Sequence, residues 1–530
     1  MILPLTPVRF IQRARSLWGR KTGVVCGSSR FTYQEFSDRC DRLSSALLGL
    51  GAKPGDRVAY LSQNCHRLLE AYYGVPAVGA VLMPLNTRLA PSELLSIVEN
   101  AAPRLLFFSS ELAAQAEALA RHGAGTTAAI CLDGPALPWA FGKDYDALIQ
   151  SEAPAQIDWT ALDENATAEM FYTSGTTAAP KGVMLTHRNL YLHALSVAQA
   201  QKLGDDDVGT YAVPLFHVNS WGAPHTLTLS GARHVILPKC DAALMADLIE
   251  RERITRLQMV PSMVSTLIAH PDFERHDVSS VREVMIGGAP SNIALIRRVE
   301  EKFPGAVVAG GYGLTETSPV ATIAYIKDHL TRDSPEAVLR RKASAGYVIT
   351  GTEAMIVDSS GRALPADGDT VGELLIRSDT VMAGYRNDLD ETMSVLRDGW
   401  LHTGDLAIID DEGYVLVVDR LKDMVLSGGE NIATAEVERA ISDHPDVLEC
   451  AVIAVPDERW GEVPKALITL RSGSRATEDD IIRHCRASLA GFKVPKSVEF
   501  RESLPKGGTG KILKRQLREP YWAGRERQVN

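Results

Sequence analysis

Short apolar runs alternate with longer amphipathic runs along most of the chain, and this rhythm restricts the fold more than any other feature of the sequence. Apolar stretches at 57–61, 80–85 and 104–108 predict strands, and the segments 65–78 and 91–100 between them predict helices. The rhythm returns with strands predicted at 211–213, 234–237, 256–259, 283–286 and 306–309. Strands interleaved with helices of about ten to fifteen residues form parallel, doubly wound sheets, so we predict an α/β fold.

The later part of the chain departs from this rhythm. Residues 344–420 are rich in glycine and alternating β-formers, as in GELLIR at 372–377, which predicts an antiparallel, partly barrel-like section. A shorter unit of helices and strands follows. Because 530 residues exceed what one hydrophobic core usually holds, we predict a large N-terminal domain at 1–420 and a small C-terminal α+β domain at 421–530.

Composition excludes several classes of protein. The net charge of −10 argues against a nucleic-acid binder, which normally carries a basic excess. Seven scattered cysteines without a CxxC pair favour a reducing compartment, which we take to be the cytoplasm. No apolar run approaches the roughly 18 residues that a membrane span needs. The basic first thirty residues favour an amphipathic first helix over a transit peptide.

The segment YTSGTTAAPKGV at 172–183 is the most informative about chemistry. It follows an apolar strand and precedes a helical run that begins near His187. Hydroxyls, glycines and backbone N–H groups can surround phosphate oxygens there, while Lys181 supplies a positive charge. The spacing is wrong for a Walker A loop, which argues against a P-loop ATPase. The alternative for the segment taken alone is a flexible surface loop.

This segment closely resembles the phosphate loop of the adenylate-forming superfamily, which includes acyl-CoA synthetases, beetle luciferases and peptide-synthetase adenylation domains. Its departure is Ala178, where members usually have glycine. Further segments match signatures of the superfamily in the same order. They are GGAP at 287–290, GYGLTETS at 311–318, WLHTGD at 400–405, DRLKD with SGGENI at 419–432, and PKGGTGKI at 505–512. The chain is identified as a member of the acyl-CoA synthetase branch.

The resemblance implies ATP, Mg²⁺ and coenzyme A. In the family Glu316, with Thr173, would hold Mg²⁺ on the phosphates, Tyr312 would lie against adenine, and Asp405 would accept from the ribose hydroxyls. The nucleotide-binding candidates are Thr173, Ser174, Gly175, Thr176, Thr177, Lys181, Gly288, Ala289, Pro290, Gly311, Tyr312, Gly313, Thr315, Asp405, Arg420 and Lys422.

The resemblance also implies the reaction: a carboxylic acid, ATP and CoA give acyl-CoA, AMP and diphosphate through an acyl-adenylate. Lys511 is the expected catalytic lysine, and the flanking glycines favour that role over a solvated lysine in a basic tail. His217 is a second catalytic candidate. The small domain is expected to be mobile, with a pivot at Lys422. Some relatives carry lysine where this chain has Leu426, so no second catalytic lysine is assigned there.

The acid is expected to contact PLFHVNSWG at 214–222, where His217 replaces the aspartate of amino-acid-activating relatives. Trp221 would share a helical face with it, although core packing is an equal alternative for this side chain. We expect a medium- to long-chain fatty acid; the alternatives are a short-chain or aryl acid (methylthio-propionate or benzoate type), transfer to a carrier protein, or a luciferase-like oxidation. The acyl and CoA candidates are His217, Trp221, Gly288, Gly311, Ser427, Gly428 and Gly429. A homodimer is also compatible with the resemblance.

Overall fold

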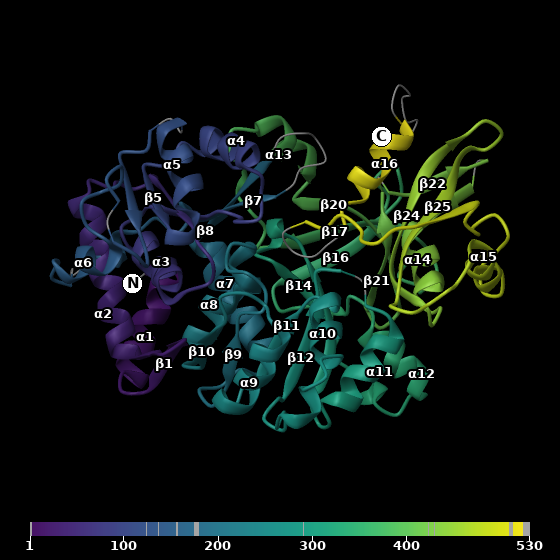
Figure 1. Ribbon diagram of the computed structural model, residues 1–530, viewed down its shortest axis with the longest axis horizontal. Helices are drawn as coiled ribbons and strands as arrows, with labels where there is room; N and C mark the ends of the chain where they lie inside the picture. The colour runs from purple at the N-terminus through teal and green to yellow at the C-terminus, as the bar shows by residue number, and fades with distance from the viewer. Residues whose placement is uncertain are drawn as a thin grey trace.

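The structure is a computed structural model that describes residues 3–122, 125–135, 137–154, 157–173, 180–289, 291–421, 423–428, 430–507 and 512–522. Within these residues the strands form four sheets, called A to D below. In Figure 1 the N-terminal elements lie at the left, the middle of the chain at the lower centre and the C-terminal unit at the right. No helix of the described part is both long and apolar enough to cross a membrane.

Sheet B has the strand order β18-β8-β7-β4-β3-β5-β6, with β3 to β7 parallel to one another and β8 antiparallel to both of its neighbours, β7 and β18. Neighbouring side chains on β3 point to opposite faces: Val58 and Tyr60 cluster with helices α2 and α3, whereas Ala59 and Leu61 cluster with α4 and α5. Both faces are therefore covered, as predicted for a doubly wound sheet. The elements are α2 (Tyr33–Gly49), β3 (Arg57–Leu61), α3 (His66–Ala77), β4 (Val81–Pro84), α4 (Pro91–Ala101), β5 (Leu105–Phe108), η1 (Ser110–Leu112), α5 (Ala113–His122), β6 (Ala128–Cys131), α6 (Tyr145–Gln150), η2 (Trp159–Ala161), β7 (Thr167–Thr173), β8 (Lys181–Thr186) and β18 (Gly384–Tyr385).

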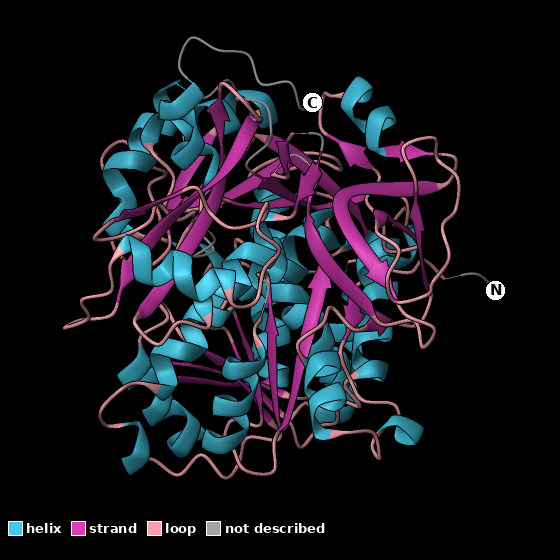
Figure 2. Cartoon of the chain, turned by 90° about the vertical axis from the view of Figure 1, so that its right-hand side faces the viewer, coloured by secondary structure: helices cyan, strands magenta, loops and turns pink. Residues whose placement is uncertain are grey.

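Sheet A has the order β15-β14-β13-β12-β11-β9-β10-β1-β2, and β1 and β9 to β13 run parallel. Helices α9, α10 and α11 pack on one face, while α7 and α8 share a core with sheets A and B. Figure 2 shows strands flanked by helices in the lower half of the molecule. The elements are α1 (Val8–Trp18), β1 (Thr22–Cys26), β2 (Ser29–Thr32), α7 (His187–Ala200), β9 (Val208–Thr210), α8 (Val218–Ser230), β10 (Arg233–Ile236), α9 (Ala242–Glu252), β11 (Arg256–Met259), α10 (Pro261–Ile268), η3 (Phe273–Arg275), β12 (Glu283–Gly287), α11 (Ile293–Lys302), β13 (Val307–Gly313), η4 (Thr315–Thr317), β14 (Val320–Ile323), η5 (Asp328–Leu330), α12 (Pro335–Lys342) and β15 (Tyr347–Val348).

One predicted strand is misplaced. The strand expected at 211–213 is β9, at Val208–Thr210. The following apolar residues are buried, but their backbone is bonded to a side chain: Asn64 donates to the carbonyls of Tyr211 and Leu237 at 3.1 Å and accepts from the N–H of Leu215 at 2.7 Å. The apolar residues at 211–213 were predicted as a strand because apolar periodicity does not separate a strand from a buried connection.

Sheet C is antiparallel, as predicted for 344–420, with the order β16-β17-β20-β19 and β21 paired to β20. Alternate residues of β16, β17 and β20, such as Ile356, Leu374 and Ala407, form its own small core. The elements are β16 (Thr352–Val357), β17 (Gly372–Ser378), α13 (Leu389–Val395), β19 (Leu396–Arg397), β20 (Trp400–Ile409) and β21 (Val415–Arg420).

Sheet D has the order β23-β22-β25-β24, with β26 paired to β25, and carries helices α14 and α15 over one core cluster and α16 over another. Asp419 at the end of β21 accepts from the backbone N–H and hydroxyl of Thr434 at the start of α14, which joins this unit to sheet C. The elements are β22 (Val425–Ser427), β23 (Glu430–Ile432), α14 (Thr434–Ser442), β24 (Val447–Asp457), β25 (Gly461–Leu470), α15 (Glu478–Arg486), β26 (Ser497–Phe500) and α16 (Lys514–Trp522).

Candidate active site

The predicted phosphate loop connects two strands rather than a strand and a helix. Thr173 ends β7, Lys181 begins β8, and the two residues are paired across an antiparallel ladder. Helix α7 starts only after β8, at His187. Of the predicted phosphate contacts, Ser174, Gly175, Thr176 and Thr177 lie outside the described residues. The ladder nevertheless fixes the two ends of the segment next to each other.

Lys181 is held by residues far away in sequence. Its ammonium group forms an ion pair with Glu391 of α13 and lies 5.2 Å from the ring centre of Tyr385. The hydroxyl of Tyr385 donates to Oε1 of Glu316 at 2.8 Å. Burial, and then the charge of Glu316, raise the pKa of Tyr385, so this hydroxyl keeps its proton and donates. Tyr385 therefore brings the predicted phosphate lysine and the predicted metal carboxylate together.

Glu316 lies in the short helix η4 and is half-buried. Its backbone carbonyl accepts from the N–H of Met382 at 2.8 Å, which fixes the residue relative to the segment before β18. The described residues contain no group of three or more His, Cys, Asp or Glu side chains that could hold a metal ion. A single carboxylate such as that of Glu316 is compatible with Mg²⁺, which in nucleotide sites takes one or two carboxylates and obtains its other ligands from phosphates and water.

Two glycine-containing strand ends lie side by side. Gly287 of β12 and Gly311 of β13 are paired, and a Cβ on Gly287 would lie 3.0 Å from the carbonyl oxygen of Gly311. A Cβ on Gly313 would lie 1.7 Å from the carbonyl oxygen of Pro319, so only glycine fits there. These strands end where ligands of parallel sheets bind. Gly288 and Ala289 follow β12, Thr315 is buried in η4, and Pro290 lies outside the described residues.

Asp405 is buried and is contacted by two donor side chains. It accepts from the hydroxyl of Tyr312 at 2.7 Å, and Nε of Arg420 lies 3.2 Å from its other oxygen. Although burial opposes the charged form, the carboxylates of Asp405 and then Asp423 raise the pKa of Arg420. Each carboxylate oxygen has a lone pair for a second donor, which is the capacity needed to accept from neighbouring hydroxyls of a sugar. The third predicted residue of this group, Lys422, lies outside the described residues.

Trp221 lies on a left-handed turn rather than on a right-handed helix, which corrects the prediction that it shares a helical face with His217. Val218, Asn219, Ser220 and Trp221 all have positive φ angles, between 32° and 60°. For residues other than glycine this conformation costs about 1–2 kcal/mol each, so surrounding contacts must hold it. His217, half-buried, occupies the N-cap of α8 just before the turn.

The turn places the indole of Trp221 against the glycine strand ends. The side chain is only 5% exposed and belongs to the core cluster that includes Val260 and Met285. A Cβ on Gly287 would lie 3.3 Å from the Trp221 ring, and one on Gly288 would lie 3.4 Å from it. Trp221 is thus a core residue that also packs next to Gly287 and Gly288, of which Gly288 is a predicted nucleotide contact.

The candidates of the C-terminal unit are only partly described. Ser427 is buried at the end of β22, and Gly428, with φ of +60°, donates its N–H to the carbonyl of Trp460 at 2.8 Å. A Cβ on Gly428 would lie 2.6 Å from the Trp460 ring, so the glycine permits this packing. Gly429 and Lys511 lie outside the described residues. The base of the predicted lysine loop is closed by a bridge between Lys506 and Ile512.

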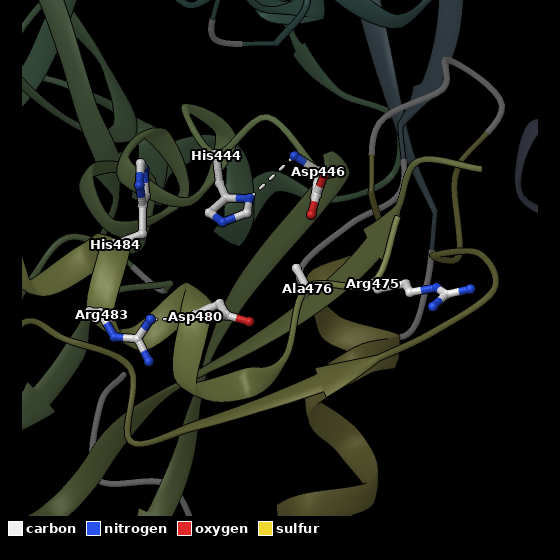
Figure 3. A pocket seen from close by; sticks show the side chains of 7 residues that line it. All are labelled: His444, Asp446, Arg475, Ala476, Asp480, Arg483 and His484. Atoms are coloured by element: carbon white, nitrogen blue, oxygen red, sulfur yellow. Dashed lines mark hydrogen bonds and ion pairs between the residues drawn. The ribbon is translucent and has the colours of Figure 1, made fainter. Parts of the chain in front are cut away.

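A cavity of about 440 Å³ lies away from all of these motifs, on the C-terminal unit next to α15 (Figure 3). Its polar groups partly satisfy one another, since His444 Nδ1 accepts from the backbone N–H of Asp446 at 3.2 Å and Arg483 bonds to Asp480 at 3.1 Å. The lining residues are His444, Asp446, Arg475, Ala476, Asp480, Arg483 and His484.

Sequence reasoning missed several residues that the fold brings to the site. Tyr385 and Glu391 follow Lys181 by more than two hundred positions, and neither belongs to a recognised motif. A buried acid on β7, Glu169, and the histidine His225 of α8 were likewise unmarked. A carboxylate inside the apolar strand 168–172 was the one available signal for Glu169, because acids are rarely buried unless paired.

Comparisons with known proteins give one consistent result. The profile "AMP-binding enzyme" matches residues 11–386, and "AMP-binding enzyme C-terminal domain" matches residues 436–511. The chain is 38% identical over 97% of its length to a long-chain-fatty-acid–CoA ligase of Thermus thermophilus, covering 95% of that protein. It is also 38% identical over 96% of its length to a feruloyl-CoA synthase of Amycolatopsis sp, covering 98% of it. The crystal structure of an anthranilate CoA ligase in complex with anthranoyl-AMP superposes with a TM-score of 0.88, at 25% identity and 98% coverage of both chains.

Proposed function

The chain belongs to the AMP-binding enzymes and is an AMP-forming acid–CoA ligase, and we propose that its acid is a medium- to long-chain fatty acid. The observation that carries this substrate proposal is the position of Trp221, a buried apolar side chain next to the glycine strand ends. The similarity to a long-chain-fatty-acid–CoA ligase supports it. His217 stands where an ammonium-binding aspartate would be needed for an amino acid, which argues against that substrate class.

We propose that the first half-reaction forms an acyl-adenylate. A carboxylate oxygen of the acid attacks the α-phosphorus of ATP, a carbon–oxygen–phosphorus linkage forms, and the bond to the β-phosphate breaks with its electron pair leaving on diphosphate. This step mainly requires positioning and neutralisation of negative charge. Lys181 supplies positive charge next to the ends of the phosphate loop. Lys511 would bridge the carboxylate and the α-phosphate, by analogy with the family motif.

The nucleotide is proposed to lie between the glycine strand ends and sheet C. Asp405 would accept from the ribose hydroxyls, with Arg420 beside it, and Tyr312 would lie against the adenine. Glu316 and Thr173 would hold Mg²⁺ together with the phosphates. When bound, the ion neutralises charge on the phosphate oxygens. Tyr385 orients the Glu316 carboxylate for this purpose through its hydrogen bond.

In the second half-reaction the sulfur of CoA would attack the acyl carbon, the thiol proton would be lost, and AMP would leave with the electron pair of the carbon–oxygen bond. We propose that Ser427, Gly428 and Gly429 border the pantetheine arm, since glycine permits close approach. The small domain, residues 421–530, would rotate about Lys422 between the two half-reactions. His217 would border the carboxylate end of the acid, because it precedes the turn that carries Trp221.

A planar aryl acid is the second candidate. The identity to the feruloyl-CoA synthase equals that to the fatty-acid ligase. The indole of Trp221 next to Gly288 would contact an aryl ring as it would an alkyl chain.

A panel of acids separates the two candidates. Purified enzyme, ATP and Mg²⁺ are offered straight-chain acids of increasing length, together with benzoate, cinnamate and ferulate, and diphosphate exchange into ATP is measured. Fatty acids longer than about eight carbons should give the highest kcat/KM, because each buried methylene adds binding energy. A preference for ferulate or benzoate over every straight-chain acid would overturn the fatty-acid proposal. Adding CoA or an acyl carrier protein then identifies the acceptor.

We further propose a cytoplasmic enzyme, because all seven cysteines are free thiols, as expected in a reducing compartment. A homodimer is proposed as well, to be tested by light scattering of the purified protein.

A further inference from the structure

The left-handed turn at 218–222 is held by a polar group that the proposed chemistry does not use. The side chain of Asn219 spans it: Oδ1 accepts from the N–H of Gly222 at 2.7 Å, and Nδ2 donates to Oε2 of Glu169 at 2.8 Å. Ser220 adds a hydrogen bond from its hydroxyl to the carbonyl of Val213 at 2.8 Å. Since a run of left-handed residues does not persist alone, these bonds decide where Trp221 lies.

Glu169 is fully buried on β7, four residues before the end of the strand at Thr173. Its second oxygen lies 2.6 Å from Nε2 of His225, which is 1% exposed on α8. His225 Nδ1 has no hydrogen-bond partner among the described residues. The ring therefore carries its hydrogen on Nε2 and donates it to the Glu169 carboxylate. A buried carboxylate is tolerated only when paired in this way.

Neighbouring aromatic side chains fix the histidine. The rings of Tyr72 and Tyr73 meet His225 edge-on at 5.9 and 5.7 Å. Their hydroxyls donate to the backbone carbonyls of Leu215 and Pro224, both at 2.7 Å, on either side of the turn. The acid–histidine pair is thus tied to the same backbone that carries Trp221.

Gly222 of the turn is also confined. A Cβ on Gly222 would lie 2.6 Å from Cε1 of His193, whose Nε2 accepts from the N–H of Val320 at 3.0 Å. The turn therefore contacts both the polar group of Glu169, Asn219 and His225 and the ring of His193. These contacts fix the backbone on both sides of Trp221, at Asn219, Ser220 and Gly222.

We propose that Glu169, Asn219 and His225 are positioning residues that hold the indole of Trp221 on the Gly287–Gly288 wall and thereby set which acids the enzyme accepts. The inference rests on the proposed function in one respect, that Trp221 bounds the acyl site. The three residues act through Trp221 and do not touch the reacting atoms. They also connect the Gly287–Gly288 wall to β7, the strand that leads into the phosphate loop.

The test uses substitutions that separate the side chain of Asn219 from its backbone conformation. Asn219→Gly keeps a residue suited to positive φ but removes both amide bonds, whereas Asn219→Ala removes the bonds and adds backbone strain. Glu169→Ala removes the carboxylate of this side chain, whereas Glu169→Gln keeps a side-chain carbonyl that can still accept from Asn219. His234→Gln is the matched control, because His234 is equally buried and bonds to Tyr211 and Thr228 without contacting the turn.

Two measurements are made on each folded variant. The first is kcat/KM for adenylation across the acid panel, with the KM for ATP measured in parallel. Asn219→Gly and Glu169→Ala should change the ratio between the best and second-best class of acid by roughly tenfold, the scale of small changes in an apolar pocket. The KM for ATP should stay within about twofold, and Glu169→Gln should restore part of the selectivity. The second measurement is the emission of Trp221, obtained by subtracting the spectrum of each Trp221→Phe counterpart, which should shift to longer wavelength as the indole is released.

The outcomes distinguish this inference from the proposed function. If the wild type adenylates no acid in the panel, the proposed function fails, and the emission of Trp221 still decides whether the three residues hold the indole. If the wild type is active but Asn219→Gly and Glu169→Ala keep its acid profile and its Trp221 emission, the inference is overturned. Equal changes in His234→Gln would also overturn it, since general loss of stability would then be the cause.

Discussion

Replacing Glu391 by Gln should tighten the binding of ATP. In the structure Glu391 forms an ion pair with Lys181, the lysine proposed to receive the phosphates. The phosphates must therefore displace a carboxylate, and Gln removes that competing charge while keeping the shape of the side chain. The variant also leaves Tyr385 above Lys181 and its bond to Glu316 in place.

The size of the expected change in ATP affinity depends on how far Lys181 and Glu391 are exposed to solvent. Two unit charges about 4 Å apart attract by about 4 kcal/mol at an effective dielectric constant of about 20. Lys181 is 10% exposed but Glu391 is 31% exposed, and partly exposed pairs retain about 1 kcal/mol or less after solvent screening. One kcal/mol corresponds to about a fivefold change in affinity. The dissociation constant of ATP in Glu391→Gln should thus fall by up to about fivefold.

Titration calorimetry with ATP in the absence of acid measures this constant directly. The matched control is Glu353→Gln, which removes an equal charge from an exposed pair with Arg377 on sheet C. The control should leave ATP affinity unchanged. Weaker ATP binding in Glu391→Gln would refute the reasoning, because Glu391 would then position Lys181 for the phosphates instead of competing with them.

Three further outcomes are expected. Lys511→Ala should lower the rate of adenylation by about 10²–10³-fold and have far less effect on thioester formation from preformed adenylate; equal losses in the two half-reactions would contradict its assignment. Trp221→Ala should shift the acid profile toward longer or bulkier acids, measured by diphosphate exchange, and an unchanged profile would leave Trp221 with a packing role alone. Burial, and then the charge of Lys21, lower the pKa of His234 to about 3, so the unfolded state binds more protons and stability falls as pH drops below about 6.5. His234→Gln should therefore reduce the slope of unfolding free energy against pH between about 4 and 6 by about 1.4 kcal/mol per pH unit, as measured by denaturant unfolding, and an unchanged slope would contradict a neutral buried imidazole.

The sequence predicted the sheets well because their strands are short, apolar and separated by amphipathic helices. The strands predicted at 57–61 and 256–259 match β3 and β11 to the residue, and the one at 283–286 is one residue shorter than β12. The prediction failed at 211–213, where Asn64 supplies the hydrogen bonds from another element. Such a contact depends on tertiary structure and leaves no local pattern.

The sequence motifs identified some of the site residues, and only the fold identified the residues that pair with them. Thr173 at the end of β7, Glu316 in η4 and Asp405 within β20 each belong to a recognised signature. Tyr385, the partner of Glu316, and Glu391, the partner of Lys181, come from β18 and α13, which follow no recognised pattern. The left-handed turn before Trp221 was likewise missed, because its residues are ordinary in a right-handed helix and the bonds to Glu169 are long-range.

The fate of the carboxylate oxygen tests the central claim most directly. The acid is labelled with ¹⁸O in its carboxyl group and incubated with enzyme, ATP, Mg²⁺ and CoA, and the nucleotide product is examined by mass spectrometry. If the acid attacks the α-phosphorus, AMP carries one ¹⁸O atom and one diphosphate is released for each acyl-CoA. Unlabelled nucleotide, or ADP with the label in inorganic phosphate, would contradict the acyl-adenylate route.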